Sequence, residues 1–345
     1  MKSFTRAATA LAAALSIAAV AACGGTGGSA DDPDAVTVYS ADGLASWYKT
    51  QFAAFERETG IRVDYVEGGS GEVVSRAAKE KANPQMDVLV TLPPFIQQAD
   101  RQGLLGDTSI AEADALPAQA KAPSGHYLAL ADNYFTMIRG TAVTPAPETW
   151  TDLLDDRFDQ KIQYSTPGQA GDGTALLLLL RHVMGDDGAL DYLGRLQANN
   201  VGPSASTGKL GPKVSKGELA VANSDVQMAL ASIADDGAAY ETFIPAGPDG
   251  KRTTIALPYF MGLAADAPHP ENAQKLVDFL MSVPVQKTLA GEVFGISART
   301  DVPTTGDDEA IRAAVAGVDV WQPDWSEVDE NFQALIDAYN KATDQ

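Results

Sequence analysis

The sequence predicts an α/β protein with two lobes and a ligand cleft between them. From Val36 onward, short β-branched segments alternate with segments whose apolar residues recur at helical spacing. A similar alternation starts at Lys161, and a later strand-like segment followed by a helix returns the chain to the first unit. This order predicts parallel sheets with helical crossovers, and two such lobes bind small ligands in the cleft between them.

The first lobe is predicted to begin with the order strand, helix, strand, helix, strand. Its strands are expected at 36–39, 61–65 and 87–91. The first helix is expected to begin at Leu44 and to end at Gly60. The second follows the Gly-rich segment 68–71 and extends to 83–84, and the third begins at 93–94. Because the carboxyl ends of parallel strands meet at one edge, a ligand is expected there.

The second lobe repeats the same logic. Strands are expected at 161–164 and 221–225, and Gly-rich loops at 166–174 and 206–209, the first of which feeds a helix near Ala175. A strand at 255–260 and a helix at 270–282 then belong to the first lobe. We therefore expect lobe 1 to comprise residues 36–134 and 254–298, and lobe 2 to comprise residues 135–253 and 299–345.

The first 22 residues have the pattern of a secretory signal peptide. Two cations precede an apolar run that contains no carboxylate. The run ends at Cys23 in a Val-Ala-Ala-Cys sequence that resembles the lipobox of bacterial lipoproteins, which implies that Cys23 is lipidated. Residues 23–35 are then a flexible tether, and the domain is expected on the outer face of the cell membrane.

Charge and cysteine content exclude several kinds of partner. The net charge of −21 makes binding to nucleic acid implausible, because a polyanion would be repelled. The single cysteine excludes an intrachain disulfide and a cysteine-built metal site. We expect a monomer without a cofactor, and an anionic ligand could be held only at a local site.

Three hydroxyl side chains stand at the predicted strand ends: Ser40, Ser70 and Thr91. Each lies near a predicted helix start, where free backbone N–H groups and the helix dipole favour an anion. Ser and Thr are also common helix N-caps, so a purely structural role is the alternative for each of them alone.

No catalytic motif is complete. The segment 202–209 resembles a phosphate-binding loop but has the wrong glycine spacing, and Leu210 follows where Ser or Thr is needed. Glu72 stands where a nucleophile elbow needs its last glycine. The three histidines show no metal-ligand spacing. A binding protein is therefore predicted rather than an enzyme.

Several segments resemble the 2-aminoethylphosphonate-binding proteins of ABC importers. The likeness rests on Tyr-Ser-Ala-Asp-Gly-Leu at 39–44, Gly-Gly-Ser-Gly-Glu-Val-Val at 68–74, Asn-Pro at 83–84, and Asp-Val-Leu-Val-Thr-Leu-Pro-Pro-Phe-Ile-Gln at 87–97. The resemblance implies the type II periplasmic binding-protein fold, a phosphonate ligand held by hinge closure, and delivery of that ligand to a membrane permease.

Such a ligand needs donors for its phosphonate and an acid or aromatic face for its ammonium. The residues expected to hold the phosphonate are Ser40, Ser70, Gly71, Thr91, Gly173, Thr174 and Thr207. Those expected to hold the ammonium are Asp225 first, then Asp172 and Asp42, with Tyr39 or Tyr259 offering a ring face.

Other ligands stay open at this point. Within the same fold, the alternatives are ferric iron, phosphate or a phosphate ester, and a polyamine. No two of the ten tyrosines are adjacent, which argues against the ferric binders that use adjacent tyrosines. A lipid-anchored hydrolase of phosphonates or phosphoesters is the alternative from another class, and it would need a metal cluster or an activated nucleophile.

Overall fold

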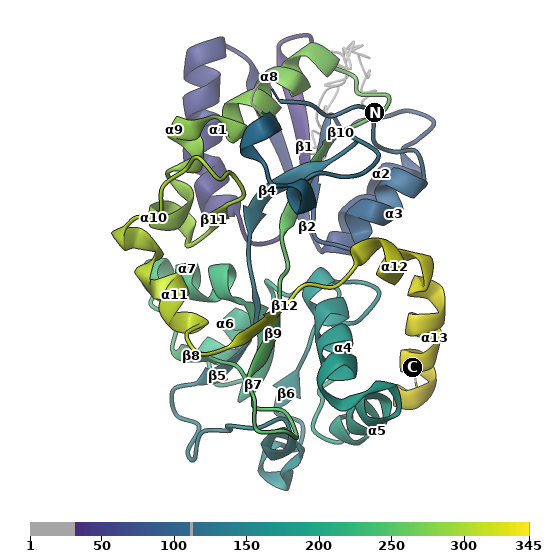
Figure 1. Ribbon diagram of the computed structural model, residues 1–345, viewed down its shortest axis with the longest axis vertical. Coiled ribbons are helices and arrows are strands. Elements are labelled where there is room, and N and C mark those ends of the chain that lie inside the picture. Colours follow the sequence, from purple (N-terminus) through teal and green to yellow (C-terminus); the bar gives the residue numbers. More distant parts are fainter. Residues whose placement is uncertain (1–31, 111–112, 345) are drawn as a thin grey trace, which may run out of the picture.

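The computed structural model describes residues 32–110 and 113–344. The predicted signal peptide, the lipidation at Cys23 and most of the tether therefore lie outside the described residues. Figure 1 shows two lobes stacked along the long axis, with the chain crossing between them near the middle.

The upper lobe is built on a six-stranded sheet in the order β11-β4-β10-β3-β1-β2. Its strands are β1 (Ala35–Ala41), β2 (Arg62–Gly68), β3 (Val88–Thr91), β4 (Leu128–Asp132), β10 (Tyr259–Leu263) and β11 (Ile296–Ser297). Strand β1 pairs in parallel with both β2 and β3, as the sequence predicted, whereas β10 runs antiparallel to β3 and β4.

Helices cover this sheet (Figure 1). They are α1 (Ala45–Thr59), α2 (Ser70–Lys79), α3 (Phe95–Arg101), α8 (Pro270–Met281), α9 (Val283–Gln286) and α10 (Leu289–Val293), with short 3-10 turns at Ala113–Ala115 and Ala118–Ala120. Helix α1 buries an aromatic face on which Tyr48 stacks on Phe52 at 4.7 Å between ring centroids and contacts Tyr65 of β2. These rings close the core beneath β1.

The lower lobe is built on a four-stranded sheet in the order β6-β7-β5-β8. Its strands are β5 (Phe135–Gly140), β6 (Ile162–Gln163), β7 (Val221–Asp225) and β8 (Tyr240–Phe243). Its helices are α4 (Gly171–Met184), α5 (Asp186–Leu196), α6 (Gly211–Ser215) and α7 (Val226–Asp236), with 3-10 turns at Thr151–Leu154 and Asp156–Phe158.

A third, two-stranded sheet and the C-terminal helices complete the chain. Strand β9 (Thr253–Ile255) pairs in parallel with β12 (Asp319–Trp321). The remaining elements are a 3-10 turn at Gly306–Asp308 and the helices α11 (Glu309–Ala314), α12 (Trp325–Glu330) and α13 (Phe332–Thr343). Helix α12 is tied to the upper lobe by an ion pair between Arg101 and Asp329, and α13 to the lower lobe by a hydrogen bond of 3.0 Å between the hydroxyls of Tyr339 and Tyr164.

The strands of the six-stranded sheet lie within 35–132 and 259–297, and those of the four-stranded sheet lie within 135–243. The C-terminal segment returns to pair with β9. The residue limits expected for the two lobes stay a prediction, whereas the α/β architecture in two lobes is confirmed.

Two predicted elements differ from the structure. The strand expected at 255–260 is divided between β9 and β10, with Pro258 in the break, because proline has no N–H to offer a sheet ladder. Helix α4 begins at Gly171 rather than near Ala175, and the N–H of Thr174 already donates to the carbonyl of Ala170 at 3.0 Å. The first turn of α4 therefore comes from residues that were expected in a loop.

Candidate ligand-binding site

The two lobes touch where the N-termini of α2 and α4 face each other. The N–H of Gly71 donates across the lobes to the carbonyl of Gln169 at 2.9 Å. A Cβ on Gly69 would stand 2.2 Å from the carbonyl oxygen of Ala205, so the backbones approach closely here. The structure is thus a closed one, and the side chains at the strand ends are enclosed between the lobes.

Two of the predicted hydroxyl residues meet at this contact. The hydroxyl of Thr91, the last residue of β3, donates to the carbonyl of Ser70 at 3.1 Å. The Ser70 hydroxyl lies 3.0 Å from the place where a Cβ on Gly171 would stand, so it faces the start of α4. Ser40 is also buried, and its hydroxyl donates to the Ala41 carbonyl at 2.9 Å.

Two buried carboxylates lie on the opposite side of the contact. Asp172 in the first turn of α4 is 3% exposed, and Asp225 at the end of β7 is 0% exposed. Burial first, and then the negative charge of Asp225, raise the pKa of Asp172 well above its ordinary value, although the neighbouring Thr207 hydroxyl acts in the opposite direction. One carboxyl oxygen of Asp172, Oδ1, has no hydrogen-bond partner among the described residues.

Asp225 is held by its own lobe. Its carboxylate accepts a hydrogen bond of 2.7 Å from the N–H of Met228 and so caps α7. Burial raises the pKa of Asp225 to about 6, although the bond from the Met228 N–H and the Tyr259 hydroxyl oppose the shift. Because the charge of Asp225 disfavours ionisation of Asp172, a cation beside this pair would be favourable.

Asp42 and Tyr259 extend this acidic group toward solvent. The Tyr259 hydroxyl donates to the backbone carbonyl of Asp42 at 2.8 Å and lies 3.4 Å from the Asp225 carboxylate. Burial raises the pKa of Asp42, while hydrogen bonds from Ser206 and Gly208 and the charge of Lys209 lower it. Burial and the charges of the three aspartates raise the pKa of the Tyr259 phenol, which therefore stays protonated as a donor.

Three predicted residues are not brought to this group. The ring of Tyr39 lies under the Arg76 guanidinium at 4.8 Å, and its hydroxyl donates to Glu80 at 2.6 Å, so the ring face expected for an ammonium is engaged elsewhere. Gly173 backs onto Ser165, whose carbonyl oxygen would be 2.0 Å from an added Cβ. The Thr174 hydroxyl donates inside its own helix to the carbonyl of Ala170 at 2.9 Å.

Two other predicted phosphonate ligands already have protein partners. The N–H of Gly71 is bonded to Gln169, as described above, and the Thr207 hydroxyl donates to the Ser165 hydroxyl at 2.9 Å. Ser165 was not predicted from the sequence, although it lies two residues after the end of β6. Asn133, which follows β4 and stands beside Asp225, was not predicted either, because its strand was not recognised. The rule of polar residues at strand ends would have found Ser165, because its strand was predicted, but not Asn133.

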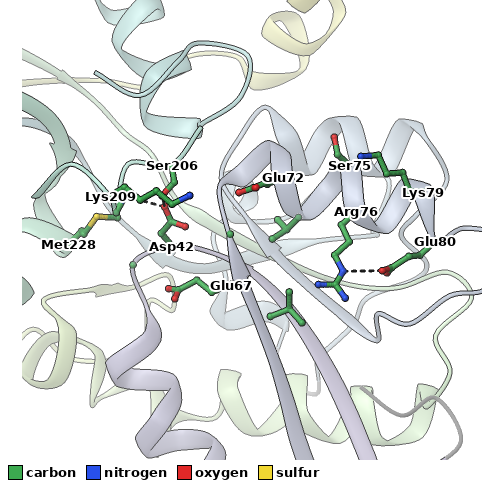
Figure 2. Close-up of a pocket in the computed structure, with 15 residues that line it drawn as sticks. Asp42, Glu67, Glu72, Ser75, Arg76, Lys79, Glu80, Ser206, Lys209 and Met228 are labelled. Carbon is green, nitrogen blue, oxygen red and sulfur yellow. Dashed lines mark hydrogen bonds and ion pairs between the residues drawn. The ribbon is translucent and has the colours of Figure 1, made fainter. Parts of the chain in front are cut away.

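A cavity of about 740 Å³ opens beside Asp42 at the mouth of the contact (Figure 2). Its walls come from β2 and α2 of the upper lobe and from the 206–209 segment and Met228 of the lower lobe. Acidic and basic side chains are mixed around it, namely Glu67, Glu72 and Glu80 with Arg76, Lys79 and Lys209, and Arg76 forms an ion pair with Glu80. Of the three aspartates, only Asp42 lines this cavity.

Two features are absent from the part of the chain that the structure describes. Within residues 32–110 and 113–344, no three His, Cys, Asp or Glu side chains are grouped so as to hold a metal ion. In the same ranges, no helix has the length and apolar character required to span a bilayer.

The fold and the enclosed polar contact between lobes define a solute-binding protein, and the comparisons agree. The chain belongs to the family of bacterial extracellular solute-binding proteins, whose model matches residues 39–287. A relative from Salmonella typhimurium strain LT2 is 46% identical over 316 residues, which cover 90% of this chain and 92% of the relative, and it is named "Putative 2-aminoethylphosphonate-binding periplasmic protein".

Solved structures share the fold at low sequence identity. The periplasmic binding protein P5PA has a TM-score of 0.76 at 22% identity, covering 89% of this chain and 99% of its own. The periplasmic binding protein AfuA from Actinobacillus pleuropneumoniae, solved with fructose-6-phosphate, has a TM-score of 0.75 at 18% identity, covering 90% of this chain and 99% of its own. The predicted type II periplasmic binding-protein fold is thereby confirmed.

Proposed function

We propose that this protein is the binding component of an ABC importer and that it captures 2-aminoethylphosphonate. The relative at 46% identity, whose name carries this ligand, supports the choice of ligand. The observation in this chain that carries the proposal is the buried pair Asp172 and Asp225, which lies across the lobe contact from hydroxyl groups at the start of α2.

The acidic pair suits the ammonium end of the ligand. Asp172 has a buried oxygen without a partner among the described residues, and burial raises the pKa of both carboxylates; the charge of Asp225 adds to the shift of Asp172, and the charge of Asp42 adds to that of Asp225. An ammonium placed there restores the balance of charge and donates charge-assisted hydrogen bonds. Phosphate or an unsubstituted phosphonate offers no such cation and would be repelled.

The hydroxyl side suits the phosphonate end. Ser70 is the first residue of α2, where the helix dipole favours an anion, and Thr91 at the end of β3 contacts it. These residues belong to the upper lobe, and the two aspartates belong to the lower lobe. A zwitterion of this kind therefore contacts both lobes and stabilises the closed form, which a permease then recognises. No chemical step is required.

We further propose that the protein is exported and lipid-anchored, with residues 1–22 as the signal peptide and Cys23 as the lipidated residue. Cys23→Ser should move the protein from the membrane fraction to the soluble fraction of cells that express it.

A thermal-shift panel tests the ligand directly. We expect 2-aminoethylphosphonate to raise the melting temperature, since a ligand at 100 times its dissociation constant stabilises the protein by about 2.7 kcal/mol. Ethylphosphonate, which lacks the amine, is the matched control and should have a much smaller effect at the same concentration. A response only to ferric iron, spermidine or a phosphate ester would overturn the proposal and name the alternative ligand.

A further inference from the structure

Asp42 reaches from one lobe to the other. It follows β1 of the upper lobe, where its N–H donates to the Gly68 carbonyl at 3.0 Å and its own carbonyl accepts from Tyr259. Its carboxylate oxygen Oδ2 accepts hydrogen bonds from Ser206 at 2.5 Å and from the N–H of Gly208 at 3.1 Å, both in the lower lobe (Figure 2).

The backbone around this contact is shaped for a close approach. An added Cβ on Gly208 would stand 3.2 Å from the Asp42 carboxylate, which leaves little room for a larger residue. Asp42 thus has a backbone fixed to one lobe and a carboxylate engaged by the other. Asp225 differs, because its carboxylate caps a helix of its own lobe.

We propose that Asp42 is a latch that holds the two lobes closed and not a ligand for the ammonium. The inference deepens the proposed function, because closure is what encloses the ligand, but the contact itself involves no ligand. A latch changes the fraction of molecules in the closed form, so its loss weakens every ligand that requires closure by the same factor. Loss of a direct ammonium ligand weakens only ligands that carry an amine.

The test combines scattering without ligand and calorimetry with two ligands. Small-angle X-ray scattering of ligand-free Asp42→Ala should give a larger radius of gyration than the unaltered protein. Asp42→Asn, which keeps an acceptor oxygen, should give an intermediate value. Affinities of Asp42→Ala for 2-aminoethylphosphonate and for ethylphosphonate should fall by one common factor of roughly 10 to 100, the range for lost hydrogen bonds to a charged group.

Glu67→Gln is the matched control. Glu67 lines the same cavity and is exposed, and its side chain lies near Tyr65 and the backbone of Gly43, both in the upper lobe. It should leave the radius of gyration unchanged. Ser206→Ala, which removes the partner from the other side, should open the ligand-free protein in the same direction as Asp42→Ala, and adding it to Asp42→Ala should have no further effect.

An unchanged radius of gyration in ligand-free Asp42→Ala would overturn the latch. A loss of affinity confined to the amine-bearing ligand would overturn it as well, and would indicate that Asp42 binds the ammonium directly. The scattering result is independent of the ligand: if the ligand-free variant opens but 2-aminoethylphosphonate does not bind the unaltered protein, the latch stands and the proposed ligand fails.

Discussion

Asp225→Asn should make the protein more stable and a poorer binder of amines. Asn is as good a helix N-cap as Asp, so the bond from the Met228 N–H and the start of α7 are preserved. What changes is the charge. Asp225 is 0% exposed, so burial disfavours its ionised form in the folded protein, and the charge of Asp42 adds to this effect.

The size of both effects follows from the site. The pKa of Asp225 is raised from 3.8 to about 6, and at 1.36 kcal/mol for each pKa step this corresponds to about 3 kcal/mol of stability lost by pH 7. A neutral Asn avoids that loss, so the free energy of unfolding without ligand should rise by an amount of this order. The ammonium loses hydrogen bonds to a charged group, about 1.5–3 kcal/mol, so the affinity for 2-aminoethylphosphonate should fall roughly 10- to 150-fold.

Thermal unfolding and calorimetry at pH 7 measure the two quantities. Asp235→Asn, an exposed acid near the other end of α7, is the control and should change neither. Ethylphosphonate should bind Asp225→Asn at least as tightly as it binds the unaltered protein. Equal losses of affinity for both ligands would show that Asp225 does not bind the ammonium. A lower melting temperature of the ligand-free variant would show that the buried charge of Asp225 does not destabilise the folded protein.

Three further predictions rest on the same contacts. The free energy of unfolding of the ligand-free protein should fall as pH rises from about 4 to 6, because folded Asp225 retains a proton that the unfolded chain has released; a flat chemical-denaturation profile there would contradict its raised pKa. Ser70→Ala and Thr91→Ala should each weaken phosphonate binding by about 1.5–3 kcal/mol in calorimetry, and unchanged affinity would remove them from the site. Gly173→Ala should destabilise the fold by about 1–3 kcal/mol, since its Cβ would stand 2.0 Å from the Ser165 carbonyl, whereas Gly188→Ala, exposed in α5, should be neutral or stabilising in the same melts.

Strand ends were the part of the site that the sequence could predict. β-Branched segments and helical spacing located β1, β2, β3 and β7, and the ends of these strands indicated Ser70, Thr91 and Asp225. Strand β4 was not recognised, because its Leu-Ala-Leu-Ala sequence has weak strand propensity and no polar alternation. Asn133 was missed with it.

Side-chain direction explains the other differences. Successive side chains of a strand point to opposite faces, so Tyr39 and Ser40 of β1 cannot both face one ligand. Tyr39 instead packs under Arg76. Gly173 lies in the first turn of α4, where the close approach of the Ser165 backbone leaves no room for a side chain.

Contacts between the lobes could not be predicted from local pattern. Asp42 and Ser206 are 164 residues apart in the chain, and neither segment has a local sequence pattern that indicates contact with the other. The sequence grouped Asp42 with Asp172 and Asp225 as acids for one ammonium. In the structure the three acids differ in their hydrogen-bond partners. The Asp42 carboxylate accepts hydrogen bonds from the other lobe, whereas Asp172 has one oxygen without a partner among the described residues.

The central claim is that a zwitterion lies with its ammonium at the buried aspartates and its phosphonate at the start of α2. A crystal structure with 2-aminoethylphosphonate tests it most directly. The account predicts the amine nitrogen about 2.7–2.9 Å from carboxylate oxygens of Asp172 and Asp225, the range of charge-assisted hydrogen bonds, and phosphonate oxygens on Ser70 and Thr91. A ligand bound in the reverse direction, or outside the contact between the lobes, would contradict it.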